Sequence, residues 1–135
     1  MSYKINEIEG IGPSYAEKLA KAKIGNTDDL LEKCATPAGR KSTSESTGVG
    51  ESHLLKWANM ADLMRVKGVG RQFAELLEAA GVDTVKELRN RNADNLAAKM
   101  KEVNATKNLT NATPADSVVE GWIKEAKTMD PKITY

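Results

Sequence analysis

A pair of glycines around one apolar residue occurs twice in this chain, each time ahead of an amphipathic segment. Gly10-Ile11-Gly12 returns as Gly68-Val69-Gly70, and the flanking residues 5–34 and 63–92 align along their whole length. Matching pairs include Ile8 with Val66, Tyr15 with Phe73, Ala16 with Ala74, Leu19 with Leu77, Ala22 with Ala80 and Ile24 with Val82. Agreement in both the glycine and the apolar positions indicates one supersecondary unit that is used twice.

Each copy is predicted to form a short helix, the glycine turn and two further helices. In the first copy, Ile5–Ile8 enters the turn, and Pro13 suits the first position of a helix over 13–23 because its φ is fixed near the helical value. Asn26 and Asp29 have the spacing of a capping box, as do Thr84 and Glu87 in the second copy. A further helix therefore starts at each of these caps.

The rest of each half has a similar but looser outline. Thr36-Pro37 is predicted to start a helix that runs toward 46, and Gly48-Val49-Gly50 forms another glycine turn before a helix over 51–64. Residues 40–47 are rich in Ser and Thr, which lowers helix propensity, so we expect a frayed or mobile segment there.

In the second half, Asn92 is predicted to cap a helix over 93–103, and Thr113-Pro114 with Asp116 to start one over 114–128. Between them, 104–113 replaces a fourth glycine turn with a longer polar loop. The sequence leaves open whether this loop is ordered.

We therefore predict an all-α chain without a sheet, since residues of high strand propensity rarely cluster or alternate. Its two halves, 1–64 and 65–135, each hold a pair of turns, and the fourth is degenerate. Because no linker of Gly, Pro or Ser separates the halves, we expect them to pack as one rigid body.

Charge and composition exclude several classes of protein. The net charge is +1, from 20 basic and 19 acidic residues, so the whole molecule does not attract nucleic acid. No apolar run is long enough to span a bilayer and the N-terminus lacks the apolar core of a signal peptide, so a cytoplasmic location without membrane contact is expected. The single Cys34 suits a small buried position.

The glycine turns also carry a family resemblance. Ile8 to Gly12 and Val66 to Gly70, each followed by an alanine and leucine stripe, resemble the hairpin of the helix-hairpin-helix superfamily, and Thr47 to Gly50 is a looser match. Nearly the whole chain is similar to a bacterial family of tandem helix-hairpin-helix proteins of unassigned function. The resemblance implies that the hairpins hold a nucleic-acid backbone through their amides without reading sequence, with two related hairpins gripping a duplex.

The resemblance implies phosphate contacts at the three glycine turns, and the flanking charges favour the third. The nucleic-acid-binding residues it implies are Lys67, Gly68, Val69, Gly70 and Arg71, with Gly10, Gly12, Gly48 and Gly50 in the first half. Glycines permit the positive φ that reverses the chain, while Ile11, Val49 or Val69 plugs the core. Open amides at the following helix N-terminus then form a ready phosphate site.

The charges around the turns differ. Glu7, Glu9 and Glu17 surround the first turn and Glu51 follows the second, whereas Arg65, Lys67 and Arg71 flank the third. Two hypotheses follow. One is a non-enzymatic module that binds duplex DNA or another nucleic acid weakly and non-specifically; the other is a protein-interaction or scaffold module whose hairpins are purely structural.

No other pattern in the sequence points to catalysis. No nucleophile stands beside a partnered base, and His53, the only histidine, has no second metal ligand near it, so we expect no enzyme activity, metal, cofactor or small-molecule substrate. Trp57 and Trp122 occupy corresponding positions on the last helix of each half and are predicted core anchors, with stacking of an exposed indole as the alternative. A basic stretch comprises Lys86, Arg89, Arg91, Lys99 and Lys101, either a solvated face or an extension of a phosphate track.

Overall fold

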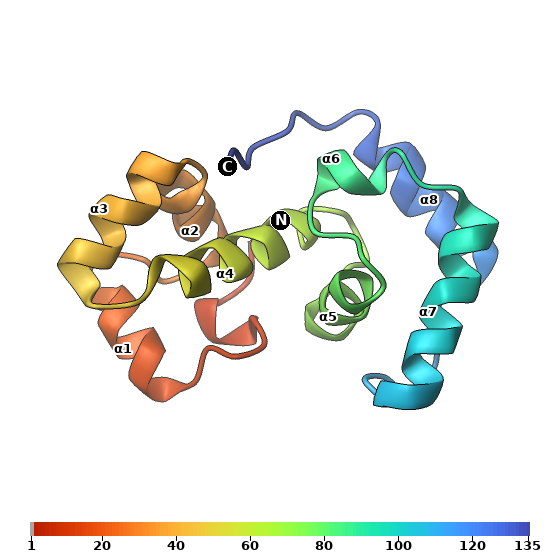
Figure 1. Ribbon diagram of the computed structural model, residues 1–135, viewed down its shortest axis with the longest axis horizontal. Coiled ribbons are helices and arrows are strands. Elements are labelled where there is room, and N and C mark those ends of the chain that lie inside the picture. Colours follow the sequence, from red (N-terminus) through yellow and green to blue (C-terminus); the bar gives the residue numbers. More distant parts are fainter. Residues whose placement is uncertain (1) are drawn as a thin grey trace.

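The computed structural model describes residues 2–135, and within them the chain is all-helical (Figure 1). The elements in chain order are η1 (Ile5–Glu7), α1 (Pro13–Lys21), α2 (Thr27–Cys34), α3 (Pro37–Thr47), α4 (Glu51–Leu63), α5 (Arg71–Ala79), α6 (Val85–Leu88), α7 (Ala93–Lys107) and α8 (Asp116–Ala126). The described part has no β-strand, only an isolated antiparallel bridge between Lys4 and Asn26. The predicted all-α fold is confirmed.

Helix α4 is the central element. Figure 1 shows α1, α2 and α3 on one side of it and α5 to α8 on the other. Leu54 and Met60 of α4 are buried, and they belong to the same connected hydrophobic cluster as Leu77 of α5 and Met100 of α7. The two halves thus share apolar core along α4, and their behaviour as one rigid body stays a prediction.

The repeat seen in the sequence recurs in the backbone angles. Gly10 and Gly68 have φ of +95° and +90°. After the next helix, Lys23 (φ +64°) occupies the place of Gly81 (φ +95°). A left-handed residue therefore follows each of α1 and α5, although only the second copy has a glycine there.

The end of each half shows the same kind of correspondence. Gly48 (φ +78°) ends α3 and Asn108 (φ +51°) ends α7, and in both cases the amide donates to the carbonyl four residues back at 2.8 Å. Asn tolerates this conformation better than other side chains do. The fourth turn therefore keeps the left-handed step of the glycine turns, and the side chain of Asn104 orders the loop by hydrogen bonds to residues 109 and 110.

Three local expectations are wrong. Residues 104–107 belong to α7 and not to the loop predicted over 104–113. Residues 40–47 lie in α3 rather than in a frayed segment, because Thr36 caps that helix, Pro37 begins it, and Arg40 and Thr43 are buried. Helix α8 begins at Asp116 with Ala115 as an N-cap that makes no side-chain bond, so Thr113 does not cap it.

The residues after α8, 127–135, form a C-terminal strap across the molecule. After α8 the chain returns to the first half, where the Thr134 amide donates to the Ala35 carbonyl at 2.8 Å and Ile133 is buried (Figure 1). Arg40, 5% exposed, donates to the carbonyls of Cys34 and Thr134. The strap thus joins the last residues to the α2–α3 corner.

Candidate nucleic-acid interface

The three glycine turns place their apolar residues inward and their glycines outward. Ile11, Val49 and Val69 are 4%, 1% and 0% exposed, so each plugs the core as predicted. Of the glycines predicted to contact phosphate, Gly70 is half-buried. The others are exposed: Gly10, Gly12, Gly48, Gly50 and Gly68. The backbone of each turn is therefore open to a ligand from outside.

Helix capping divides the eight helices into two sets. Helices α2, α3, α6 and α7 start at Asn26, Thr36, Thr84 and Asn92, whose side chains each accept from a first-turn amide. Helices α1, α4, α5 and α8, which follow the turns, have N-caps without a side-chain hydrogen bond. First-turn amides are unsatisfied within a helix, so the turns leave donors available in these helices.

At the third turn, two carboxylates from distant parts of the chain occupy groups that the sequence assigned to phosphate. Glu125 of α8 accepts from the Lys67 amide at 3.0 Å. Glu9 of the first turn accepts from Arg71 Nε at 2.8 Å and also pairs with its terminal nitrogen. The predicted basic surroundings are therefore partly neutralised, and no local sequence signal marks these partners.

The Glu9–Arg71 pair also brings the first and third turns together. The second turn adjoins the first in another way, through an aromatic cluster. Tyr15 packs against Trp57 with ring centroids 5.0 Å apart, and the exposed His53 contacts both rings. His53 therefore packs among aromatic side chains at the start of α4 with its ring tilted against them.

The two tryptophans are core anchors, as predicted. Trp57 is 2% exposed and Trp122 is 4% exposed, and Trp122 contacts Phe73 as Trp57 contacts Tyr15. Each indole Nε1 lies beside the left-handed glycine of a turn: a Cβ built on Gly10 would be 3.3 Å from that of Trp57, and one on Gly68 would be 3.4 Å from that of Trp122. The repeat thus includes an indole against a glycine in each half.

A cleft of about 190 Å³ lies where the halves meet. Its lining includes Glu9, Lys56, Glu75, Glu78 and Lys107. Burial, and secondarily the nearby Glu9 carboxylate, raise the pKa of Glu75, while Arg71 opposes the shift. This cleft gathers carboxylates beside the third turn, which disfavours phosphate within the cleft itself.

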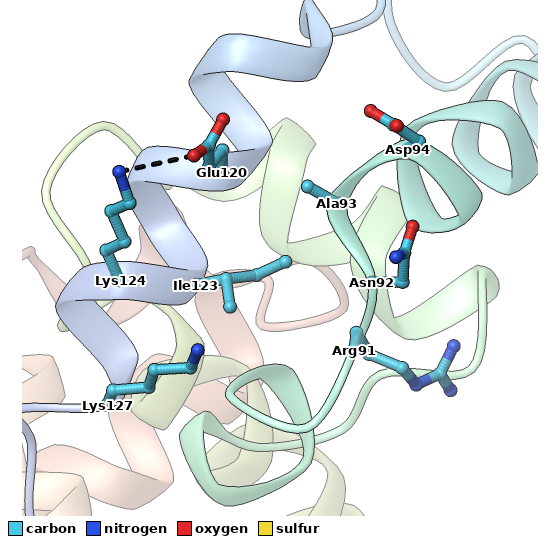
Figure 2. Close-up of a pocket in the computed structure, with 8 residues that line it drawn as sticks. All are labelled: Arg91, Asn92, Ala93, Asp94, Glu120, Ile123, Lys124 and Lys127. Atoms are coloured by element: carbon cyan, nitrogen blue, oxygen red, sulfur yellow. Dashed lines mark ion pairs between the residues drawn. The ribbon is translucent and has the colours of Figure 1, made fainter.

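A second hollow, of about 330 Å³, lies between the start of α7 and α8 (Figure 2). Figure 2 shows Lys124 pairing with Glu120, with Asp94 on the opposite wall. The distance between Lys124 Nζ and Glu120 Oε1 is 3.2 Å. Arg91 of the basic stretch donates to the Gly81 carbonyl at 2.9 Å and pairs with Glu87. The mixed charge indicates that this part of the basic stretch does not form a one-sided phosphate track.

Within residues 2–135, no group of three or more His, Cys, Asp or Glu side chains is arranged to hold a metal ion. No helix of the described chain has both the length and the apolar character needed to cross a membrane.

Comparison with protein families identifies the chain. A family model described as Domain of unknown function (DUF4332) matches residues 9–129, so the chain belongs to this family. No curated protein and no solved structure matches it. The match covers all the glycine turns and excludes only the two ends.

Proposed function

We propose that this member of the DUF4332 family is a non-enzymatic module that binds the backbone of duplex DNA weakly and without sequence preference. In this proposal the turns act as helix-hairpin-helix hairpins, and the third, Lys67 to Arg71, makes the main contact. The observation that carries it is the capping pattern: the helices after the turns lack side-chain caps, whereas the other helices have them.

The chemistry of an uncapped helix start suits a phosphate. At α5, Gly70 contributes no side-chain acceptor. The amides that follow it lie at the N-terminus of the helix, which is the positive end of the helix dipole. Lys67, three residues before Gly70, is exposed. These groups recognise the backbone and carry no base information, so the binding is expected to be independent of sequence.

The Glu9–Arg71 ion pair is compatible with this proposal because it is exposed. The side chains of Arg71 and Glu9 are 51% and 44% accessible. Ion pairs of such exposure contribute only about 0–1 kcal/mol. A DNA phosphate can therefore take the place of Glu9 on Arg71 at small cost, and Glu9 reduces affinity without abolishing it.

The first prediction is that charge at the third turn controls duplex affinity. Lys67→Gln should weaken binding and make the plot of log affinity against log salt shallower by about 1, since one phosphate contact is lost. Glu9→Gln should strengthen binding because it frees Arg71. Fluorescence anisotropy of a labelled duplex over a range of salt concentrations measures both effects.

Lys41→Gln is the matched control, since Lys41 is an exposed lysine of α3 that takes no part in the proposed contact. Its affinity and salt slope should equal those of the wild type. A wild-type protein that shows no duplex binding at low salt, or a Lys67→Gln variant indistinguishable from Lys41→Gln, would rule the proposal out.

Protein interaction is the second candidate. It is favoured by the carboxylates at the third turn and by Val118, an apolar residue of α8 that is 45% exposed near the Trp122 helix face. Nuclease treatment of a pull-down separates the two functions: partners that remain support protein interaction, and partners that all disappear support nucleic acid.

A further inference from the structure

Two tryptophan N–H groups lie at equivalent turns without an acceptor from the chain. The indoles of Trp57 and Trp122 are nearly buried, yet the side-chain hydrogen bonds found within residues 2–135 include none from either Nε1. Indole Nε1–H is only a donor, and leaving a donor unpaired costs about 1–3 kcal/mol. Each N–H is therefore free to donate to water or to a bound ligand.

Both nitrogens are also reachable from outside. In the described chain, Asn59 Oδ1 is the only fully enclosed side-chain nitrogen or oxygen without a partner. The two indole nitrogens also have no hydrogen-bond partner, but they are not fully enclosed. Each therefore retains contact with solvent. The indole nitrogens lie beside Gly10 and Gly68, where a Cβ atom would be 3.3 Å from Trp57 Nε1 and 3.4 Å from Trp122 Nε1.

The glycines therefore do more than permit positive φ. At Gly68 the missing side chain leaves the Trp122 N–H uncovered, beside the turn that leads into the uncapped start of α5. One donor comes from a nearly buried side chain and others come from the backbone. Such a set, next to the exposed Lys67, suits an acceptor that is negatively charged and has several oxygens.

We propose that the Trp122 indole N–H and the open amides of the third turn together bind a phosphate oxyanion. Trp57 forms the same arrangement at the first turn, which has no basic residue between Lys4 and Lys18 and is therefore the weaker site. At the third turn the anion has to compete with Glu125 and Glu9, which accept from the Lys67 amide and from Arg71. The oxyanion is either free phosphate or the backbone of a nucleic acid. If the ligand is a nucleic-acid backbone, the inference rests on the proposed function. If the ligand is free phosphate, it does not depend on that function.

Proton–nitrogen correlation spectra of the full chain test this directly, because each tryptophan gives one indole signal. Trp57→Phe and Trp122→Phe assign the two signals. The protein is titrated with inorganic phosphate and, separately, with duplex DNA, and sodium chloride at matched ionic strength is the control. The Trp122 indole signal should move saturably in both titrations and more than that of Trp57, and chloride should leave it in place.

The same variants give an affinity readout. Trp122→Phe keeps an aromatic side chain and removes the donor, so phosphate and duplex affinity should each fall about tenfold, as expected for one lost hydrogen bond to an anion. Should this variant fail to fold, the wild-type titration decides alone.

The outcomes separate this inference from the proposed function. A shift with phosphate but no binding of duplex would support the oxyanion site and overturn DNA binding. Duplex binding that moves amide signals while the Trp122 indole signal stays still would overturn the inference and leave the function standing. An indole signal that responds to neither probe, or equally to chloride, would also overturn the inference.

Discussion

At the residue scale, the two glycines of each turn have different tasks. Gly10 and Gly68 adopt positive φ and lie against an indole, so both backbone and packing require glycine. Gly12 and Gly70 are extended, and a Cβ at either would meet nothing within 4 Å. Gly12 and Gly70 are therefore not required for the fold. Because they have no side chain, they leave the helices that follow them uncapped.

Lys23 gives the second prediction. It is exposed and has φ of +64°, where the second copy has Gly81. A residue with a Cβ pays roughly 1 kcal/mol or more in this conformation, which glycine does not. Lys23→Gly should therefore stabilise the protein by about 0.5–1 kcal/mol in urea denaturation.

Ala20→Gly is the opposite case. Ala20 is exposed within α1, where glycine is unfavourable, so this variant should lose about 1 kcal/mol. If Lys23→Gly destabilised the protein as much as Ala20→Gly, the strain assigned to Lys23 would be absent.

At the element scale, capping is the feature that the sequence predicted best. Asn26, Thr36, Thr84 and Asn92 all cap as expected, because a cap depends only on residues within one turn of the helix start. Asn108, in place of a glycine, was missed as the end of α7, although Asn is the usual alternative to glycine in a left-handed position.

The third prediction is that stability and binding respond in opposite directions to a new cap on α5. Gly70→Ser provides a side-chain acceptor at an extended N-cap, so the free energy of unfolding should rise by a few tenths of a kcal/mol. The same hydroxyl accepts a hydrogen bond from an α5 amide that phosphate would otherwise use, so duplex affinity should fall. Thermal unfolding and anisotropy measure the two effects.

Thr84→Ala is the complementary variant, since it removes the cap of α6 and leaves the turns unchanged. It should lower stability by about 1 kcal/mol with duplex affinity retained. A Gly70→Ser variant that binds duplex as tightly as the wild type would contradict a role for the α5 amides.

At the scale of the whole molecule, contacts between distant segments join the two halves. Asp62, 1% exposed at the end of α4, accepts from the Val85 amide at 2.8 Å and pairs with Arg65. Arg65 in turn donates to the carbonyl of Asp130 in the strap. These links run from α4 to α6 and to the C-terminal residues, so they hold the arrangement of the turns.

The fourth prediction concerns the strap. Ile133→Asp places a carboxylate where Ile133 is 8% exposed, so the strap should detach and stability should fall by about 2 kcal/mol, the value of one buried isoleucine. Limited proteolysis should then cleave within 127–135. Tyr135→Ala, at a residue 72% exposed, should change stability by less than about 0.5 kcal/mol. Equal effects of the two changes would contradict a packed strap.

Sequence patterns predicted the helices, their four side-chain N-caps and the inward position of Ile11, Val49 and Val69. Helical periodicity, caps and glycine turns are local, so each is legible within a few residues.

The surroundings of the third turn depend on the tertiary fold. Glu9 and Glu125, which bind Arg71 and the Lys67 amide, lie far from it in the chain, as does Trp122 beside Gly68. Charge flanking a motif predicts its electrostatics only if no distant carboxylate folds against it. Such contacts depend on how helices pack, which no local pattern specifies. The third turn, whose neighbours in the sequence are basic, is therefore a partly neutralised site in the folded protein.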